Sequence, residues 1–210
     1  MQVQYITTLP LSLVVVSEED IAITFGGENV IKCLTVSTTN HITVTNIIRT
    51  SVPYNTISLM NDTTFLVNTI EDRRPLRTMT MSGKEKDFDN LSQKAYGFSD
   101  NNSAYVHNND TLVLTDKSNH TAYMYDNKET CIVRTMVKDE RIERPRGVCV
   151  GPSGSIFVCT QDTNSLVQVS ASGRVLCSHT LDMKYPSTVY ISKDGKKLAV
   201  SNCALGEVKV

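Results

Sequence analysis

Short apolar runs separated by polar turns recur along the whole chain, and no segment keeps the 3.6-residue period of an amphipathic helix. Four of the runs begin at a proline, and a polar turn and a second apolar run follow each of them. The runs are rich in Val, Ile, Thr and Tyr, which favour strands. The pattern predicts an all-β protein. The four prolines are Pro10, Pro53, Pro145 and Pro186.

The spacing of these prolines indicates an internal repeat. The intervals are 43, 92 and 41 residues, and 92 is twice 46, so the long interval holds one copy without its proline. That copy is "TLVLTDKSNHTAYMYD" (Thr111–Asp126), which overlays "SIFVCTQDTNSLVQVS" (Ser155–Ser170) at a constant offset of 44. A period of about 40–45 residues with four short strands is typical of β-propeller blades. We therefore expect five copies, over residues 10–52, 53–98, 99–144, 145–185 and 186–210.

The strands within one copy are expected to differ in burial. The first, inner strand of a copy is nearly continuously apolar, as in "LVVV" and "GVCV", which predicts burial on both of its faces. The third strand alternates between apolar and polar positions, as in "LVQVS". The second apolar runs are centred 13 to 14 residues after each proline, on Ile23, Val67, Val158 and Val200.

The two ends of the chain are expected to share the fifth blade. Residues 186–210 contain three strand-like runs, and residues 3–9 ("VQYITTL") contain one. Pairing them would give a ring of five four-stranded blades and leave no exposed sheet edge. The alternative is that the chain is an open fragment of a six-bladed propeller.

The fourth copy resembles a known repeat. Residues 144–176 combine the proline, Gly154 in the first turn and "QDTNSLVQV" after the second strand, and they are similar to an NHL repeat. This family forms β-propellers, best known as the C-terminal domain of tripartite-motif ubiquitin ligases. The resemblance extends to residues 185–210 and carries family positions onto Asp162 and Asn164. It implies one propeller domain over residues 1–210 that recognises a ligase substrate and is not itself an enzyme, because the ligase activity belongs to a separate zinc-bearing region.

Composition narrows the classes of function. The net charge is −1, so the chain as a whole is not a basic nucleic-acid or membrane-surface protein. No run reaches the roughly 18–20 apolar residues of a membrane span, and the first residues lack the basic region of a signal peptide. The six cysteines form no C-x-x-C pair. We predict a cytoplasmic protein in which Cys149 and Cys159 are buried and reduced.

Motifs of catalysis are missing from the sequence. The four histidines lack zinc-ligand spacing, and "GPSGS" (Gly151–Ser155) reads as a turn between strands because it lacks the lysine and helix of a phosphate loop. We therefore expect no cofactor. Some NHL-type propellers are metal-dependent lyases, so a lyase or lactonase-type enzyme is kept as an alternative.

The loops give a more specific prediction of function than the search for catalytic motifs does. In a four-stranded meander, the turn between the second and third strands and the exit to the next blade lie at one face. Arginine and tyrosine anchor protein interfaces and also stack on single-stranded bases. We expect this face to bind a protein partner, with single-stranded RNA as the alternative, although any one of these side chains could instead be solvated or paired locally. The candidate residues are Tyr54, Arg73, Arg74, His120, Arg141, Arg144, Arg146, Asn164, Tyr185 and Asn202.

Overall fold

The structure is a computed structural model, and its described residues form β-strands and one short 3₁₀ helix. The chain divides into two compact units, Met1–Phe88 and Asp89–Val210, which are described separately. Among the described residues, no helix is long and apolar enough to cross a bilayer. The described residues are 9–39, 41–69, 76–87, 102–126, 132–202 and 208–209.

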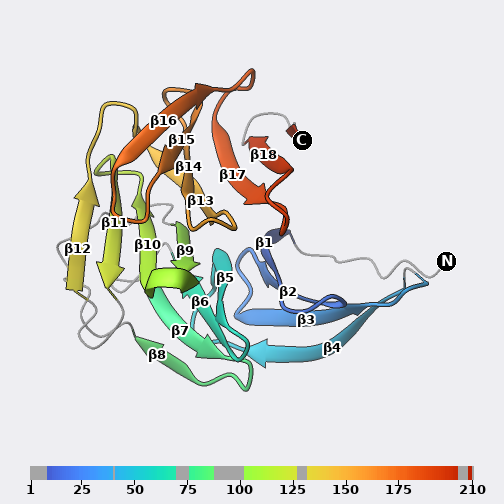
Figure 1. Ribbon diagram of the computed structural model, residues 1–210. Helices are drawn as coiled ribbons and strands as arrows, with labels where there is room; N and C mark the ends of the chain where they lie inside the picture. The colour runs from blue at the N-terminus through green and yellow to red at the C-terminus, as the bar shows by residue number, and fades with distance from the viewer. Residues whose placement is uncertain are drawn as a thin grey trace. The chain divides into compact units, whose positions relative to one another are not determined.

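The first unit contains two four-stranded antiparallel sheets, each a simple meander in chain order. Figure 1 shows them in blue and in cyan to green. The first sheet comprises β1 (Pro10–Val15), β2 (Asp20–Phe25), β3 (Val30–Val36) and β4 (Ile42–Arg49). The second comprises β5 (Thr56–Asn61), β6 (Thr64–Asn68), β7 (Leu76–Thr80) and β8 (Glu85–Asp87).

The two sheets of the first unit pack through their inner strands, β1 and β5. Ala22 and Ile31 of the first sheet and Phe65 and Val67 of the second are fully buried in one shared apolar cluster. The Ser12 hydroxyl accepts a hydrogen bond from the Ile57 backbone N–H at 3.2 Å, so a polar contact also joins the inner strands. The buried apolar surface is the main source of stability at this junction.

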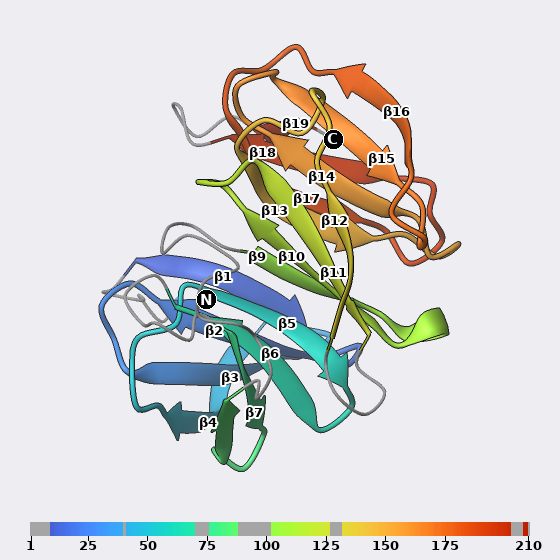
Figure 2. The same ribbon diagram turned by 90° about the vertical axis from the view of Figure 1, so that its left-hand side faces the viewer.

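The second unit contains three antiparallel sheets, and the views in Figures 1 and 2 place β13 between β9 and β17. The first sheet comprises β9 (Asn102–Val106), β10 (Thr111–Asp116), β11 (Thr121–Asp126) and β12 (Ile132–Val137), with η1 (His107–Asn109) between its first two strands. The next comprises β13 (Pro145–Val150), β14 (Ile156–Thr160), β15 (Ser165–Val169) and β16 (Val175–Thr180). The last comprises β17 (Pro186–Ile191), β18 (Leu198–Asn202) and β19 (Val208–Lys209).

The strand register confirms the 44-residue offset between the third and fourth copies. Leu112 pairs with Tyr125, and Ile156 pairs with Val169, 44 residues further along at both positions. All four side chains are buried. The centres of the second apolar runs, Ile23, Val67, Val158 and Val200, are also buried, each on the second strand of its sheet.

The predicted "GPSGS" turn is confirmed as the link between β13 and β14. The Gly151 N–H donates to the Ser155 carbonyl at 2.8 Å, and the Gly154 N–H donates to the Gly151 carbonyl at 2.9 Å. Gly154 has a φ of +77°, a conformation that side chains with a Cβ rarely adopt, which explains the glycine at this position.

Burial on both faces of every inner strand was predicted, and this is wrong for β1 and β17. Leu11, Leu13 and Val15 of β1 and Tyr190 of β17 are exposed. On β11, whose sequence alternates, five of six residues are buried. Whether a strand is buried depends on which neighbouring sheets cover it. An apolar run in the sequence indicates only that its residues are suited to burial.

The expected five four-stranded blades are not confirmed. The described residues form four four-stranded sheets, and the fifth copy forms a sheet of three strands. The strand expected at residues 3–9 lies outside the described residues except for Leu9.

Candidate functional site

Four residues of the second unit have the left-handed backbone conformation at equivalent places in successive repeats. His120 and Asn164 end the turns between the second and third strands of their sheets, with φ values of +51° and +49°. Arg144 and Tyr185 immediately precede the prolines that begin β13 and β17, with φ values of +47° and +54°. Left-handed backbone is uncommon outside glycine, so its recurrence here indicates that surrounding contacts hold these loops.

Those contacts are side-chain to backbone hydrogen bonds. The Arg144 N–H donates to His120 Nδ1 at 3.1 Å, and the Tyr185 N–H donates to Asn164 Oδ1 at 2.9 Å. The same hydrogen bond therefore forms twice, with histidine as the acceptor in one repeat and asparagine in the next. Each bond fastens a turn to the crossover that leads into the next sheet. We call the two turns and two crossovers that contain His120, Arg144, Asn164 and Tyr185 the crossover loops.

The backbone of the crossover loops is secured further by main-chain contacts. The Asn164 carbonyl accepts from the Leu181 N–H at 2.8 Å, and the Arg144 carbonyl accepts from the Gln161 N–H at 3.3 Å. Because turn and crossover are bonded to each other in two successive repeats, the expectation that they lie at one face is confirmed for this unit.

Two side chains of the crossover loops reach solvent. Tyr185 is 50 % exposed. The Arg144 side chain is 44 % exposed and lies 3.5 Å from the Asp162 carboxylate. An exposed ion pair contributes little net stability, so Arg144 can exchange Asp162 for another acceptor at small cost. The crossover loops thus present an arginine and a tyrosine from a fixed backbone.

The two other candidate arginines of this unit are held differently. Arg141 makes two hydrogen bonds of 2.7 Å to the two carboxylate oxygens of Asp139, from Nε and from a terminal nitrogen. These side-chain bonds are the main reason why the pKa of Asp139 falls to about 2. Arg146 is partly buried in β13, and its carbonyl accepts from the Thr115 hydroxyl at 2.7 Å.

The remaining candidates are not brought together with this group. Asn202 ends β18 and is partly buried. Arg73 and Arg74 lie outside the described residues. The expected rim position of Tyr54 is wrong, because its side chain is only 2 % exposed. Tyr54 and Tyr185 both stand next to a proline in the sequence. This pattern does not tell whether a tyrosine side chain is buried under the crossover or exposed to solvent.

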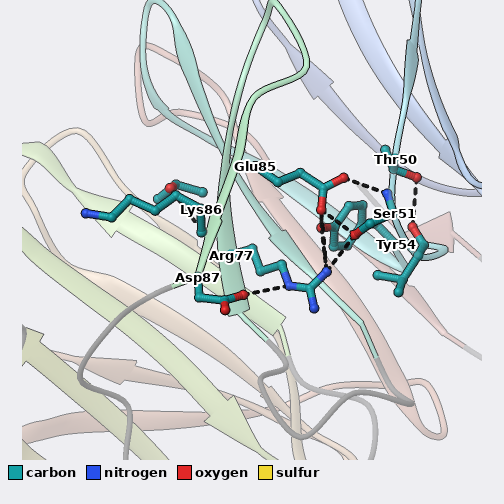
Figure 3. A network of polar contacts seen from close by, with 9 residues as sticks. Thr50, Ser51, Tyr54, Arg77, Glu85, Lys86 and Asp87 are labelled. Carbon is teal, nitrogen blue, oxygen red and sulfur yellow. Dashed lines mark hydrogen bonds and ion pairs between the residues drawn. The ribbon is translucent and has the colours of Figure 1, made fainter.

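Tyr54 instead belongs to a polar network that the sequence analysis missed (Figure 3). Its hydroxyl donates to Glu85 at 3.1 Å and accepts from a terminal nitrogen of Arg77 at 3.4 Å. Arg77 lies 3.4 Å from Glu85 and 3.0 Å from Asp87, and its side chain is 13 % exposed. The Ser51 N–H donates to Glu85 at 2.6 Å. The network fastens the crossover between the first and second sheets to β7 and β8.

Burial dominates the electrostatics of this network. Loss of water around the phenol is the largest cause that raises the pKa of Tyr54 to about 12, and the hydrogen bond from Arg77 opposes it. One sequence signal could have found the pair of Arg77 and Asp87. They lie five residues on either side of Ser82 and are directly opposite in the register of β7 and β8.

The described residues offer little for metal or nucleophilic chemistry. They contain no group of three or more His, Cys, Asp or Glu side chains that could hold a metal ion. One thiol and one imidazole lie close together on β16, where Cys177 Sγ is 3.3 Å from His179 Nε2. Cys159 is buried as predicted, whereas Cys149 is only partly buried; both thiols are free. Burial raises the pKa of both, that of Cys149 to about 12.

Comparison with known proteins gives fold similarity and no sequence family. No protein-family model and no curated protein matches the chain. A solved structure of a functionally unknown protein from Desulfotomaculum acetoxidans DSM 771 aligns with a TM-score of 0.67 at 12 % identity, over 97 % of this chain and 66 % of that one. A streptogramin B lyase structure aligns with a TM-score of 0.65 at 12 % identity, over 96 % of this chain and 68 % of that one.

This chain therefore spans about two thirds of the length of each of these proteins. At 12 % identity the likeness concerns the fold alone, and the NHL family proposed from the sequence is not confirmed. The repeated antiparallel meanders and these structural alignments together identify the fold as a β-propeller of the kind found in streptogramin B lyase.

Proposed function

We propose that the second unit is a non-catalytic platform that binds a protein partner through the crossover loops. The observation that carries the proposal is the pair of matched hydrogen bonds, from Arg144 to His120 and from Tyr185 to Asn164, beneath exposed side chains. A fixed backbone loses little conformational freedom on binding, so more of the contact free energy contributes to affinity. Arginine and tyrosine are enriched among the residues that dominate protein interfaces.

The residues proposed to contact the partner directly are Arg144 and Tyr185, with Arg141 beside them in the same crossover as Arg144. His120 and Asn164 have a positioning role, because their acceptor atoms are occupied by backbone N–H groups. Arg73 and Arg74 stay candidates from the sequence. The finer proposal, that the partner is a substrate of a ubiquitin ligase of the tripartite-motif type, rests on the sequence resemblance of residues 144–176.

Affinity capture with matched variants tests this proposal. The immobilised chain is compared with Arg144→Ala and Tyr185→Ala, and with Arg174→Ala and Tyr190→Ala as controls, since both control side chains are exposed but lie outside the crossover loops. We expect at least one protein to be captured by the wild type and by both controls, and to be lost from both test variants. Equal capture by all five proteins would refute the role of the crossover loops.

Single-stranded RNA is the competing ligand for the same loops, because arginine and tyrosine also stack on bases. Binding of a fluorescent oligouridine, measured by polarisation at increasing salt, distinguishes the two. A phosphate-dominated complex loses affinity steeply as salt rises. If oligouridine binds, with that salt dependence and with loss in Arg144→Ala, the ligand is RNA and the protein-platform proposal fails. RNase treatment in the capture experiment provides the same distinction.

A lyase is the second candidate function, and the structural alignment with streptogramin B lyase is what favours it. The test is incubation of the purified chain with streptogramin B, with and without added divalent metal, followed by liquid chromatography. Conversion above the uncatalysed rate would establish an enzyme and overturn the non-catalytic proposal.

A further inference from the structure

A thiol, an imidazole and an amide meet on the outer two strands of the sheet formed by β13 to β16. Cys177 Sγ lies 3.3 Å from His179 Nε2 and donates to Gln168 Oε1 at 3.3 Å. A thiol is a weak hydrogen-bond donor and its sulfur a weak acceptor, so both neighbours can be partners of the sulfur. One of them, the imidazole, can also take up a proton.

The register of the sheet brings these three side chains to one face. Cys177 is directly opposite Gln168 in the pairing of β16 with β15, and opposite residues point to the same side of a sheet. His179 is two residues further along β16, so it points to that side as well. Its cross-strand partner is Leu166, which is buried in an apolar cluster with residues of the next sheet. Regular strand pairing therefore positions the thiol and the imidazole.

The sulfur is accessible to small molecules. In the described part of the chain β16 is the last strand of its sheet and pairs only with β15 (Figure 2). His179 is exposed and Cys177 is partly exposed. The rate at which a cysteine attacks a disulfide depends on access to its sulfur and on removal of its proton. The surroundings of Cys177 provide for both.

A cation also lies near the thiol. The side-chain hydrogen bond to Asp139 is the main cause that raises the pKa of Arg141, and the charge of a Cys177 thiolate is among the smaller causes. The guanidinium is thus near enough to attract that thiolate. Asp139 compensates much of the arginine charge through its two 2.7 Å bonds. The imidazole, which is in direct contact with the sulfur, is therefore the more important group.

Cys33 has the opposite electrostatic surroundings and provides an internal comparison. It is also partly exposed, and it lies on β3. Burial is the main cause that raises the pKa of Cys33, and the negative charge of Asp20 raises it further. The thiolate is the nucleophilic form of cysteine, so these surroundings oppose reaction at Cys33. Burial likewise raises the pKa of Cys149 and of Cys159.

We propose that Cys177 is a modification site that forms a mixed disulfide with a low-molecular-weight disulfide, with His179 as the proton acceptor. The thiol proton moves to His179 Nε2, in the tautomer that carries its hydrogen on Nδ1. The sulfur then attacks one sulfur of the small disulfide, and the bond between the two sulfurs of that molecule breaks. The departing thiolate takes the proton from His179. Cys177 is oxidised, the departing sulfur is reduced, and no other reactant is consumed.

Gln168 can hydrogen-bond to both forms of the sulfur. Its Oε1 accepts from the thiol. After the proton has left, a half-turn of the amide group brings its NH₂ to the sulfur and donates to the negative charge. Gln168→Glu has nearly the same shape but places a negative charge beside the sulfur. This variant should therefore form the mixed disulfide more slowly than the wild type.

The first test measures which cysteine reacts. The reduced chain is incubated with excess oxidised glutathione and a metal chelator, and free thiols are then blocked with N-ethylmaleimide. Peptide mass spectrometry quantifies the glutathione adduct at each cysteine. We expect Cys177 to form the adduct about tenfold faster than Cys33, because the charges around the two thiols have opposite effects. Equal rates, or a faster reaction at Cys33, overturn the proposal.

The second test concerns the imidazole. A general base in an evolved active site contributes about 100-fold or more, and an open surface site is expected to give less, so His179→Ala should slow the Cys177 reaction about tenfold. Free imidazole in the buffer should restore part of the lost rate. Ser178→Ala is the matched control, because Ser178 is exposed on the same strand and points to the opposite face. Its Cys177 should react at the wild-type rate.

The direction of the change separates chemistry from structure. If His179 only supported the strand, its removal would loosen β16, and Cys177 would become more accessible and react faster. Cys159, which is buried in the same sheet, reports on the fold and should stay unmodified in every variant. A Cys177 rate in His179→Ala that equals or exceeds the wild-type rate refutes the proton transfer to His179.

Discussion

Replacement of Gly147 with alanine is expected to destabilise the second unit strongly, because this glycine lets two inner strands approach closely. Gly147 lies in β13 and faces the backbone of β17. An alanine Cβ would lie 2.5 Å from the Ser187 carbonyl oxygen, 2.7 Å from the Thr188 Cα and 3.0 Å from the Val189 nitrogen. Carbon atoms in contact prefer separations of about 3.5–4.0 Å, so the strands would have to part by about 1 Å.

The magnitude follows from the atoms involved. Overpacking a core typically costs about 1–3 kcal/mol, and contacts with strand backbone belong at the upper end because no flexible side chain can move aside. Alanine recovers about 0.5–1 kcal/mol that glycine loses through the greater freedom of the unfolded chain. The net loss in the free energy of unfolding is therefore about 2 kcal/mol.

Urea unfolding followed by far-ultraviolet circular dichroism measures this loss. With a denaturant slope of about 2 kcal/mol per molar urea, the midpoint should fall by about 1 M. The matched control is Gly26→Ala, whose new Cβ would meet only Leu11 side-chain atoms at 3.7 Å, an ordinary contact distance. If the two variants have the same midpoint as the wild type, β13 and β17 are not held at this separation and the reasoning is refuted.

Three further predictions concern the loops, the buried network and the thiols. His120→Asn should keep wild-type stability within about 0.5 kcal/mol, because asparagine tolerates the left-handed conformation and also carries its acceptor atom on Cγ. His120→Ala should lose about 1–2 kcal/mol, because the Arg144 N–H then lacks its acceptor. Equal urea midpoints for the two variants would contradict the matched hydrogen bond. Folding raises the pKa of Tyr54 from 10.0 to about 12. The contribution of the protonated phenol to the free energy of unfolding is therefore fully present below pH 10, and it is lost as the pH rises through 12. Tyr54→Phe should remove this part of the pH dependence of the urea midpoint. Among the four described cysteines, mass spectrometry after brief alkylation at neutral pH should show Cys177 labelled well before buried Cys159; comparable rates would argue against the burial of Cys159.

The repeat and its register could be predicted from the sequence because they are local properties. Strands in a meander pair with their neighbours along the chain, so a constant offset of 44 residues between apolar positions already fixes which side chains are opposite one another. Leu112 with Tyr125 and Ile156 with Val169 follow from that offset and are found in the sheets. The turn at Gly151–Ser155 is equally local, because glycine at position 154 accommodates its positive φ.

The candidate site could be predicted only in part. Turns and crossovers share one end of a meander by topology, which brought His120, Arg144, Asn164 and Tyr185 into the same set. The sequence could not distinguish the side chains that hold the backbone from those that face solvent, since both kinds are polar residues in loops. Tyr54 and Tyr185 both stand beside a proline, yet one is 2 % and the other 50 % exposed.

Only the tertiary structure decided the features that depend on contacts between distant segments. The Tyr54 hydroxyl is bonded to Glu85 of β8, which lies 31 residues further along the chain. The sequence pattern within either segment does not predict this contact. The apolar run of β1 resembles those of β13 and β17, but whether such a strand is covered depends on the neighbouring sheet. By itself the sequence determined the strands, their pairing and the core positions, because these depend on the alternation of residues within each repeat. The structure decided which faces are covered, because burial is a property of packing between repeats.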